Sequence, residues 1–321
     1  MKTGWILCDQ GKTGTYRQCL ALANLFEKEY GFQFIHKPIR LNLLWRYLPP
    51  HFARWKKTPY TMQDDLCPPP DLIIAAGRQA VTMAMVFRKH AFTIVLQHPK
   101  ISPYYFNLVI PPYHDNLKGK NVIPTLGALH PIRPEELLRL KLEREAIYAG
   151  LKGPRIAVLV GGDNKYYRYT DQFVKTFSKQ LRSMITESDK YKGGSFLITP
   201  SRRTRPEIIS ELEKGLEGLP YQLWKGEGDN PYMDYLAIAD AIVVTGDSIS
   251  MMSESCLMGK PAYIAEVPIQ NKKFKQFISD LYVGHHASPF GENLKSEGFQ
   301  SLNELDRVGQ QVLALFQSHD S

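Results

Sequence analysis

The feature that most constrains the fold is a segment in the last third of the chain, where a strand, a polar turn, a helix and a second strand follow one another. The apolar run at residues 241–244 predicts a buried parallel strand. Asp247 and Ser248 come next, and both are residue types that begin helices. Gly259 and Pro261 end that helix, and a new apolar run starts the next strand. Such units build parallel α/β sheets.

The beginning of this helix can serve a ligand. Free backbone N–H groups and the positive end of the helix dipole make a helix N-terminus attractive to anions. Glu254 lies one to two turns inside, where a carboxylate can accept hydrogen bonds from a ribose diol. The alternatives are ordinary helix capping by Asp247 and Ser248, and a solvated helix face for Glu254. Both interpretations stay open at this level.

The same alternation of strand and helix runs through the whole chain. It predicts an α/β fold of two doubly wound Rossmann-like domains that face a cleft. Gly and Pro at residues 153–154 separate a charged helix from a new strand, so we expect domains at 1–150 and 154–300. We expect a last helix within 301–321 to pack back on the first domain. Predicted strands include 5–8, 71–76, 92–97, 107–110 and 122–125, then 155–160, 195–199 and 221–224.

Polar residues follow the predicted strands of the first half. Asp9 ends the first strand, and His98 and His114 follow two later ones. Ligands of open α/β sheets bind at these carboxyl ends, so we take the three side chains as candidate bases, although a lone His is more often structural. The sequence at residues 11–13 suggests a phosphate-binding P-loop, but Ile6 stands where that motif needs its first Gly.

The second half supplies candidate ligand groups after two further strands. Gly161 and Gly162 follow one strand and can let backbone approach a ligand. Ser201, Arg202 and Arg203 follow the next, and arginines clustered in this way suit a diphosphate. The alternative for these arginines is solvated loop charge. No set of residues has the spacing of metal ligands, so we expect no metal.

Composition narrows the class of protein. The chain has 321 residues, of which 43% are hydrophobic and 22% charged, as in globular proteins. No apolar run reaches the roughly 18 residues of a membrane-spanning helix, and the N-terminus does not read as a signal peptide. The four cysteines read as free thiols of a reducing cytoplasm. The net charge of +8 indicates an anionic partner, and no nucleic-acid module is recognisable.

One segment, Leu41 to Lys57, is basic and aromatic, and segments of this composition can lie on an anionic membrane surface. The alternative is a core-packed helix whose Lys and Arg side chains extend to water. We expect a cytoplasmic protein that binds peripherally to the inner face of the cytoplasmic membrane if the membrane interpretation holds. The sequence does not indicate an oligomeric state.

Two family resemblances follow from these motifs. Residues 252–261 resemble the donor-binding helix of the GT-B enzyme that adds N-acetylglucosamine to the lipid intermediate of peptidoglycan. A resemblance over nearly the whole chain is to the "elongated mitochondria" family, named for a plant mitochondrial-fission factor. It rests on residues 161–162, 199–204, 224–232, 239–245 and 111–115, with Gly14 and Gln18. The chain departs from that family at Thr15, where a His is expected.

The resemblance implies a GT-B architecture and a nucleotide-diphosphate sugar as substrate, with no cofactor. It implies that Glu254 holds the donor ribose and that Asp247 and Ser248 face the diphosphate. We therefore expect a metal-independent, inverting-type glycosyltransferase. Two alternatives remain, a nucleotide-sugar epimerase and a non-catalytic nucleotide-binding or membrane adaptor protein, and Thr15 favours the second of these.

Overall fold

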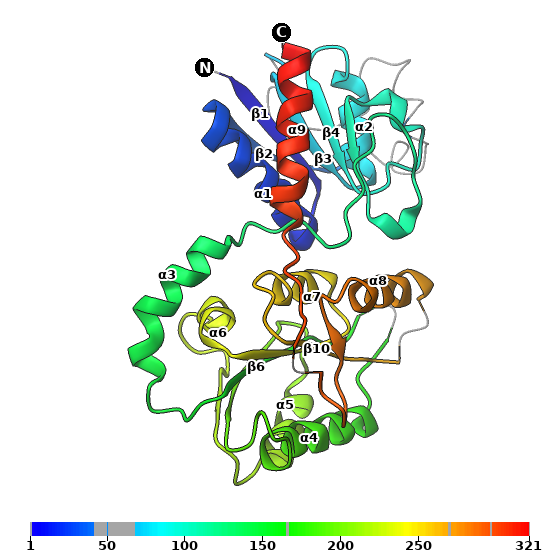
Figure 1. Cartoon of the computed structure of the whole chain (residues 1–321). Coiled ribbons are helices and arrows are strands. Elements are labelled where there is room, and N and C mark those ends of the chain that lie inside the picture. The colour runs from blue at the N-terminus through cyan, green and yellow to red at the C-terminus, as the bar shows by residue number, and fades with distance from the viewer. Residues whose placement is uncertain are drawn as a thin grey trace. The chain divides into compact units, whose positions relative to one another are not determined.

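The computed structural model describes residues 2–41, 50, 68–164, 167–268, 271–295 and 297–320. The chain divides into two compact units (Figure 1). Unit 1 consists of Met1–Pro131 and Asn303–Ser321, and unit 2 of Ile132–Leu302. No helix in the described ranges is long and apolar enough to cross a bilayer.

Unit 1 contains a five-stranded parallel sheet with the strand order β2-β1-β3-β4-β5. Its elements are β1 (Thr3–Asp9), α1 (Thr13–Tyr30), β2 (Gln33–Ile39), β3 (Leu72–Ala76), α2 (Arg78–Phe87), β4 (Phe92–Leu96), η2 (Pro103–Tyr105), β5 (Leu108–Ile110), η3 (Tyr113–Asp115) and α9 (Glu304–Asp320). The sheet has helices on both faces, as the doubly wound prediction requires.

The two cores of unit 1 follow from the alternation of side chains along its strands. Ile6 and Cys8 of β1 point into the core that β1 shares with α1 and α9. Trp5 and Leu7, which alternate with them along the strand, point into the core beneath α2. Because both faces are covered, the strands are apolar throughout, as parallel strands usually are. The last helix, α9, lies on the α1 side through Phe316.

Unit 2 contains a six-stranded parallel sheet with the strand order β11-β10-β9-β6-β7-β8. Its strands are β6 (Arg155–Val160), β7 (Ser195–Pro200), β8 (Tyr221–Leu223), β9 (Ala241–Thr245), β10 (Ala262–Ala265) and β11 (Ser288–Pro289). Its helices are α3 (Pro134–Arg144), η4 (Glu145–Tyr148), α4 (Asp171–Thr186), α5 (Pro206–Gly215), α6 (Tyr232–Ile238), α7 (Ile249–Ser255) and α8 (Lys272–Val283).

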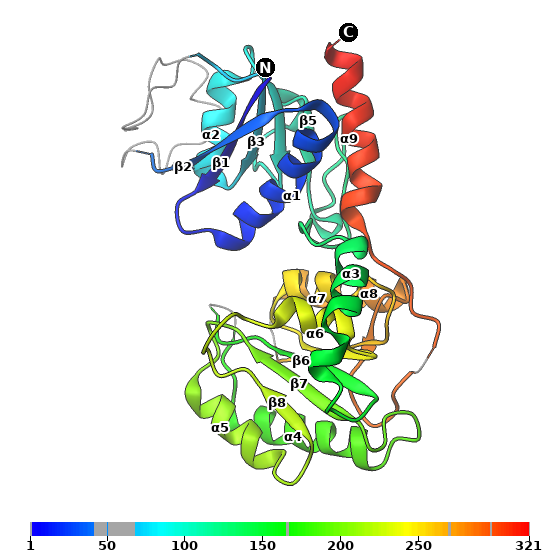
Figure 2. The ribbon, with the colours of Figure 1, turned by 90° about the vertical axis from the view of Figure 1, so that its left-hand side faces the viewer.

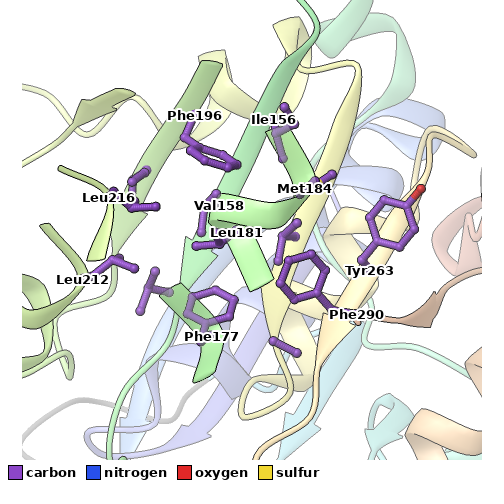
Figure 3. Close-up of a cluster of buried hydrophobic side chains, with 14 of the residues drawn as sticks. Ile156, Val158, Phe177, Leu181, Met184, Phe196, Leu212, Leu216, Tyr263 and Phe290 are labelled. Atoms are coloured by element: carbon purple, nitrogen blue, oxygen red, sulfur yellow. The ribbon is translucent and has the colours of Figure 1, made fainter. Parts of the chain in front are cut away.

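Helices cover both faces of this sheet as well, with α4 and α5 on one side and α6 and α7 on the other (Figure 2). Ile156 and Val158 of β6 face α4 and meet its Phe177 and Leu181 in a buried cluster (Figure 3). Helix α4 begins as the sequence predicts, because the side chain of Thr170 accepts a hydrogen bond from the Phe173 N–H. The doubly wound class is thus confirmed for both units.

The structure draws the boundary between the units earlier than residues 150–154. Helix α3 and η4 belong to unit 2 because they pack on α6. The Tyr148 hydroxyl donates to Asp234 at 3.1 Å, and Arg144 lies 3.7 Å from the same carboxylate. Gly153 and Pro154 therefore connect η4 with β6 inside one unit.

Candidate functional site

Three loops of unit 2 come together at the carboxyl ends of neighbouring strands. Gly161 and Gly162 follow β6, Ser201 to Arg205 follow β7, and Asp247 follows β9. The sheet order places β9, β6 and β7 side by side, so the segments predicted to bind a ligand are brought to one edge. The strand order reverses at β6, which is where open α/β sheets form their ligand crevice.

Asp247 is the centre of this edge. Its Oδ2 accepts hydrogen bonds from the Gly162 N–H at 2.9 Å and from Nη2 of Arg203 at 3.0 Å. Its Oδ1 accepts from the hydroxyls of Tyr169 at 2.8 Å and Thr245 at 2.5 Å. The Asp247 side chain has no exposed surface. Four donors, from the loops after β6 and β7 and from the end of β9, thus converge on one buried carboxylate.

These contacts set the chemistry of Asp247. Burial raises its pKa to about 7, and the nearby Asp163 carboxylate adds to the rise. The Gly162 N–H opposes it, and the Arg203 guanidinium favours the charged form. Because a carboxylate has about four acceptor positions, the four donors fill Asp247 from inside the protein. Direct contact between Asp247 and a diphosphate stays a prediction, and this geometry argues against it.

Gly161 and Gly162 serve the packing of the same network. A Cβ on Gly161 would overlap the Asp247 carboxylate, and a Cβ on Gly162 would overlap the backbone carbonyl of Arg203. The Gly161 N–H donates to Oγ1 of Thr245 at 2.8 Å. The two glycines are therefore required by the framework of the loops. Close approach of a ligand to their backbone stays a prediction.

The arginines after β7 differ in their surroundings. Arg203 is tied to Asp247 and also donates to the Gly162 carbonyl at 3.2 Å, while 42% of its side chain is exposed. Arg205 pairs with Asp163 at 3.0 Å. Arg202 is exposed and makes no ion pair with any residue that the structure describes. The Arg203 N–H donates to Oγ of Ser201, and the Ser201 N–H donates to Oγ1 of Thr204, so this segment forms a tight turn.

Helix α7 carries the last two predicted site residues of unit 2. Ser248 caps it, since its Oγ accepts from the Met251 N–H at 3.3 Å, as the sequence predicts. Glu254 is 5% exposed and accepts a short hydrogen bond from the hydroxyl of Tyr232, the first residue of α6. Sequence reasoning missed Tyr232, because a pair 22 residues apart depends on how two helices pack.

Asp9 is the last residue of β1 in unit 1, and its carboxylate accepts hydrogen bonds from the start of helix α2. Its Oδ1 accepts from the N–H groups of Gln79 at 2.9 Å and Ala80 at 3.0 Å. It thereby caps α2, whose own N-cap residue, Gly77, has no side chain to do so. Burial raises the pKa of Asp9, and these N–H groups oppose the rise.

The two histidines of unit 1 follow β4 and β5. His98 lies between two residues in the left-handed region, Gln97 with φ 71° and Lys100 with φ 61°. Its Nδ1 accepts from the Lys100 N–H at 2.9 Å, so the neutral ring carries its proton on Nε2. His114 lies half-buried in η3. None of the three candidate bases belongs to unit 2.

A cavity of about 740 Å³ lies elsewhere in unit 2. It is lined by η4, β8, the loop that follows β8, and the start of α6, including Tyr148, Trp224 and Asp234. None of the predicted site residues lines it.

In the described ranges, no group of three or more His, Cys, Asp or Glu side chains is placed to hold a metal. The segment from Leu41 to Lys57 lies outside the described residues, apart from positions 41 and 50.

Sequence comparison gives the family. A family model described as "Mitochondrial fission ELM1" matches residues 13–316. The chain is 30% identical to the uncharacterized protein RP120 of Rickettsia prowazekii, over 95% of this chain and 96% of that one. It is also 30% identical to the mitochondrial fission protein ELM1 of Arabidopsis thaliana, over 66% of this chain and 55% of the plant protein.

Structure comparison gives the fold. MurG of Acinetobacter baumannii aligns with a TM-score of 0.51 at 11% identity, over 99% of this chain and 93% of that one. The UDP-GlcNAc 2-epimerase of Methanocaldococcus jannaschii aligns with 0.54 at 11% identity, over 98% and 100%. The Neisseria meningitidis 2-epimerase bound to UDP-GlcNAc aligns with 0.53 at 11% identity, over 100% and 92%. At such low identity the likeness shows the GT-B-like fold alone, and it confirms that prediction.

Proposed function

Because the chain belongs to the mitochondrial fission ELM1 family and has a GT-B-like fold, we propose that it is a metal-independent glycosyltransferase that uses a nucleotide-diphosphate sugar. The observation that carries the proposal is the Asp247 network at the carboxyl edge of unit 2. It fixes the guanidinium of Arg203, and the preceding residue in the sequence, Arg202, is exposed. Solved proteins of this fold include enzymes named for UDP-GlcNAc, which fits such a donor.

The proposed chemistry is a single displacement. An acceptor oxygen bonds to the anomeric carbon while the bond from that carbon to the diphosphate breaks, and the electron pair leaves with the diphosphate. Arg202 and Arg203 stabilise the negative charge that develops there. Ser248 adds a hydroxyl at the same edge, and Glu254 accepts hydrogen bonds from the ribose.

The acceptor hydroxyl must lose its proton to a base. Asp9, His114 and His98 remain the candidates, all in unit 1. Burial raises the pKa of the Asp9 carboxyl, which makes it a stronger proton acceptor than an ordinary aspartate. His98 in its neutral form presents a donor at Nε2, which suits holding an acceptor oxygen more than deprotonating it.

The arginine assignment is tested by titration calorimetry with UDP and with uridine. Arg202→Gln removes an exposed cation, so UDP binding should weaken roughly 10- to 100-fold, as expected for a lost charged hydrogen bond. Uridine, which lacks phosphates, should bind the variant and the wild type alike. Arg139→Gln, which removes an exposed arginine from α3, is the control. Equal UDP affinity in Arg202→Gln and wild type would remove Arg202 from the site.

A nucleotide-sugar epimerase is the second candidate, because solved 2-epimerases share the fold. The two reactions are separated by the need for an acceptor. An epimerase converts UDP-GlcNAc with no acceptor present, which NMR of the sugar detects directly. A transferase leaves the sugar configuration unchanged until an acceptor is supplied.

A non-catalytic adaptor is the third candidate, favoured by Thr15 where the family resemblance leads us to expect a His. Its signature is nucleotide binding without turnover of any sugar. The basic segment from Leu41 to Lys57 would bring either an enzyme or an adaptor to an anionic bilayer. Co-sedimentation with vesicles containing phosphatidylglycerol, compared with neutral vesicles, tests that role separately.

A further inference from the structure

Glu254 is held by Tyr232, which lies in the segment 224–232 of the family resemblance but to which the sequence analysis assigned no role. The Tyr232 hydroxyl donates to Oε2 of Glu254, which is 5% exposed. We propose that Tyr232 is the positioning residue for ribose recognition: it orients the Glu254 carboxylate that accepts from the two ribose hydroxyls. This inference rests on the proposed function, because it presumes a nucleotide at the edge of unit 2.

Tyr232 is itself fixed by its neighbours. Its N–H donates to Oδ1 of Asn230 at 3.0 Å, and the same oxygen accepts from the Thr199 hydroxyl at 3.2 Å. Thr199 lies in β7, so the start of α6 is tied to the sheet. The phenol then joins α6 to α7 through Glu254. Its position is thus set by the fold before any ligand arrives.

The hydrogen bond has a chemical consequence for a buried carboxylate. Such a group is costly unless donors compensate it, and without them it rotates or takes up a proton. Either change removes an acceptor from the place where a diol would bind. A carboxylate accepts at about four positions, so one phenol on Oε2 is compatible with further donors from a ribose. The phenol therefore preserves the geometry on which ribose selectivity depends.

The same contact has a rival explanation, in which the phenol occupies the place of a ribose hydroxyl and must leave when a nucleotide binds. The two explanations predict opposite effects of removing the hydroxyl. A positioning phenol strengthens nucleotide binding, whereas an occupying phenol weakens it. The Tyr232 N–H is tied to Asn230 and Thr199, which fixes the backbone that carries the phenol, and the hydroxyl itself donates to Glu254; both contacts favour the positioning explanation.

The test compares the affinities of UDP and 2′,3′-dideoxy-UDP by titration calorimetry. In the wild type, UDP should bind at least tenfold more tightly than 2′,3′-dideoxy-UDP. A factor of about ten or more is what the loss of one charged hydrogen bond causes. In Tyr232→Phe this ratio should fall toward one, while the affinity for dideoxy-UDP stays the same. Glu254→Gln should lose the ratio as well. A general loss of structure would weaken dideoxy-UDP binding as well, so an unchanged affinity for dideoxy-UDP shows that the variant is intact.

Tyr235→Phe is the matched control. Tyr235 lies one turn further along α6, and its buried hydroxyl has no hydrogen-bond partner among the described residues. Its removal should leave the UDP to dideoxy-UDP ratio at the wild-type value.

Three results would overturn the inference, and they are distinguishable. A wild-type ratio that persists in Tyr232→Phe removes Tyr232 while the nucleotide site stands. Tighter UDP binding in Tyr232→Phe shows that the phenol occupies the ribose position. A wild type that binds neither ligand removes the nucleotide site itself, and this inference falls with the proposed function.

Discussion

Asp247 shows how much one residue can decide at the edge of unit 2. Local sequence placed it correctly after β9, but it did not show that the carboxylate points inward to four donors. Ser248 and Thr170 were easier, because a cap acts within three residues of itself. The hydrogen bond between Tyr232 and Glu254 could not be predicted from the sequence, because the two residues lie 22 positions apart and on different helices.

The raised pKa of Asp247 predicts a pH-dependent stability. The folded value, about 7, exceeds the unfolded value near 3.8, so between these limits the folded state keeps a proton that the unfolded state has lost. The contribution of Asp247 is therefore complete below about pH 4 and is lost as the pH rises through 7. The groups that face it are Arg203, Tyr169 and Asp163.

The measurement is the free energy of unfolding of wild type and Asp247→Asn in urea from pH 5 to 8. The advantage of wild type over the variant should shrink as the pH rises. An advantage that grows with pH would mean that the Arg203 guanidinium controls the carboxylate and holds its pKa low.

At the scale of elements, strands with covered faces were predictable, and short or irregular ones were not. Residues 122–125 were expected to form a strand, but they make only isolated bridges from Val122 to Val109 and from Thr125 to Pro112. Strand β11 is two residues long, Ser288–Pro289, and gives no periodic signal. Helix α9, Glu304–Asp320, lies within the range 301–321 in which the last helix was expected.

The turn after β6 should tolerate no side chain at Gly161. A methyl group there meets the buried Asp247 carboxylate, which four hydrogen bonds prevent from moving. Gly161→Ala should therefore lower the free energy of unfolding by roughly 2–3 kcal/mol, as overpacking does. Gly14→Ala in α1, where the methyl meets nothing within 4 Å, should be neutral or stabilising by up to about 1 kcal/mol. Urea midpoints measure both, and equal effects would contradict the packing argument.

Helix α9 should stabilise unit 1 mainly through the packing of the Phe316 ring. Phe316 is 3% exposed and packs on Phe26, Phe32 and Phe92, with ring centroids 5.2 to 5.7 Å apart. Phe316→Ala should cost about 3–5 kcal/mol in unfolding free energy. Leu315→Ala, at a neighbouring position that is 41% exposed, should cost less than about 1 kcal/mol. A mild effect of Phe316→Ala would show that α9 is dispensable for this core.

At the scale of the whole molecule, the family and the doubly wound fold were within reach of the sequence, while the reaction was not. The family model matches residues 13–316, and two of the segments that carry the resemblance, 161–162 and 199–204, contribute Gly162 and Arg203 to the Asp247 network. These loops do not indicate which sugar would be bound or which residue would act as the catalytic base.

The central claim is that unit 2 binds a nucleotide diphosphate without a metal. Its most direct test is thermal unfolding in the presence of EDTA with UDP, GDP, ADP, TDP and UDP-GlcNAc. A ligand at 100 times its dissociation constant adds about 2.7 kcal/mol, which should raise the Tm by roughly 5 °C or more. We predict such a shift for one nucleotide family and a shift reduced by about half or more in Arg202→Gln. No shift with any of them, in well-folded protein, would contradict the claim and favour a non-catalytic adaptor.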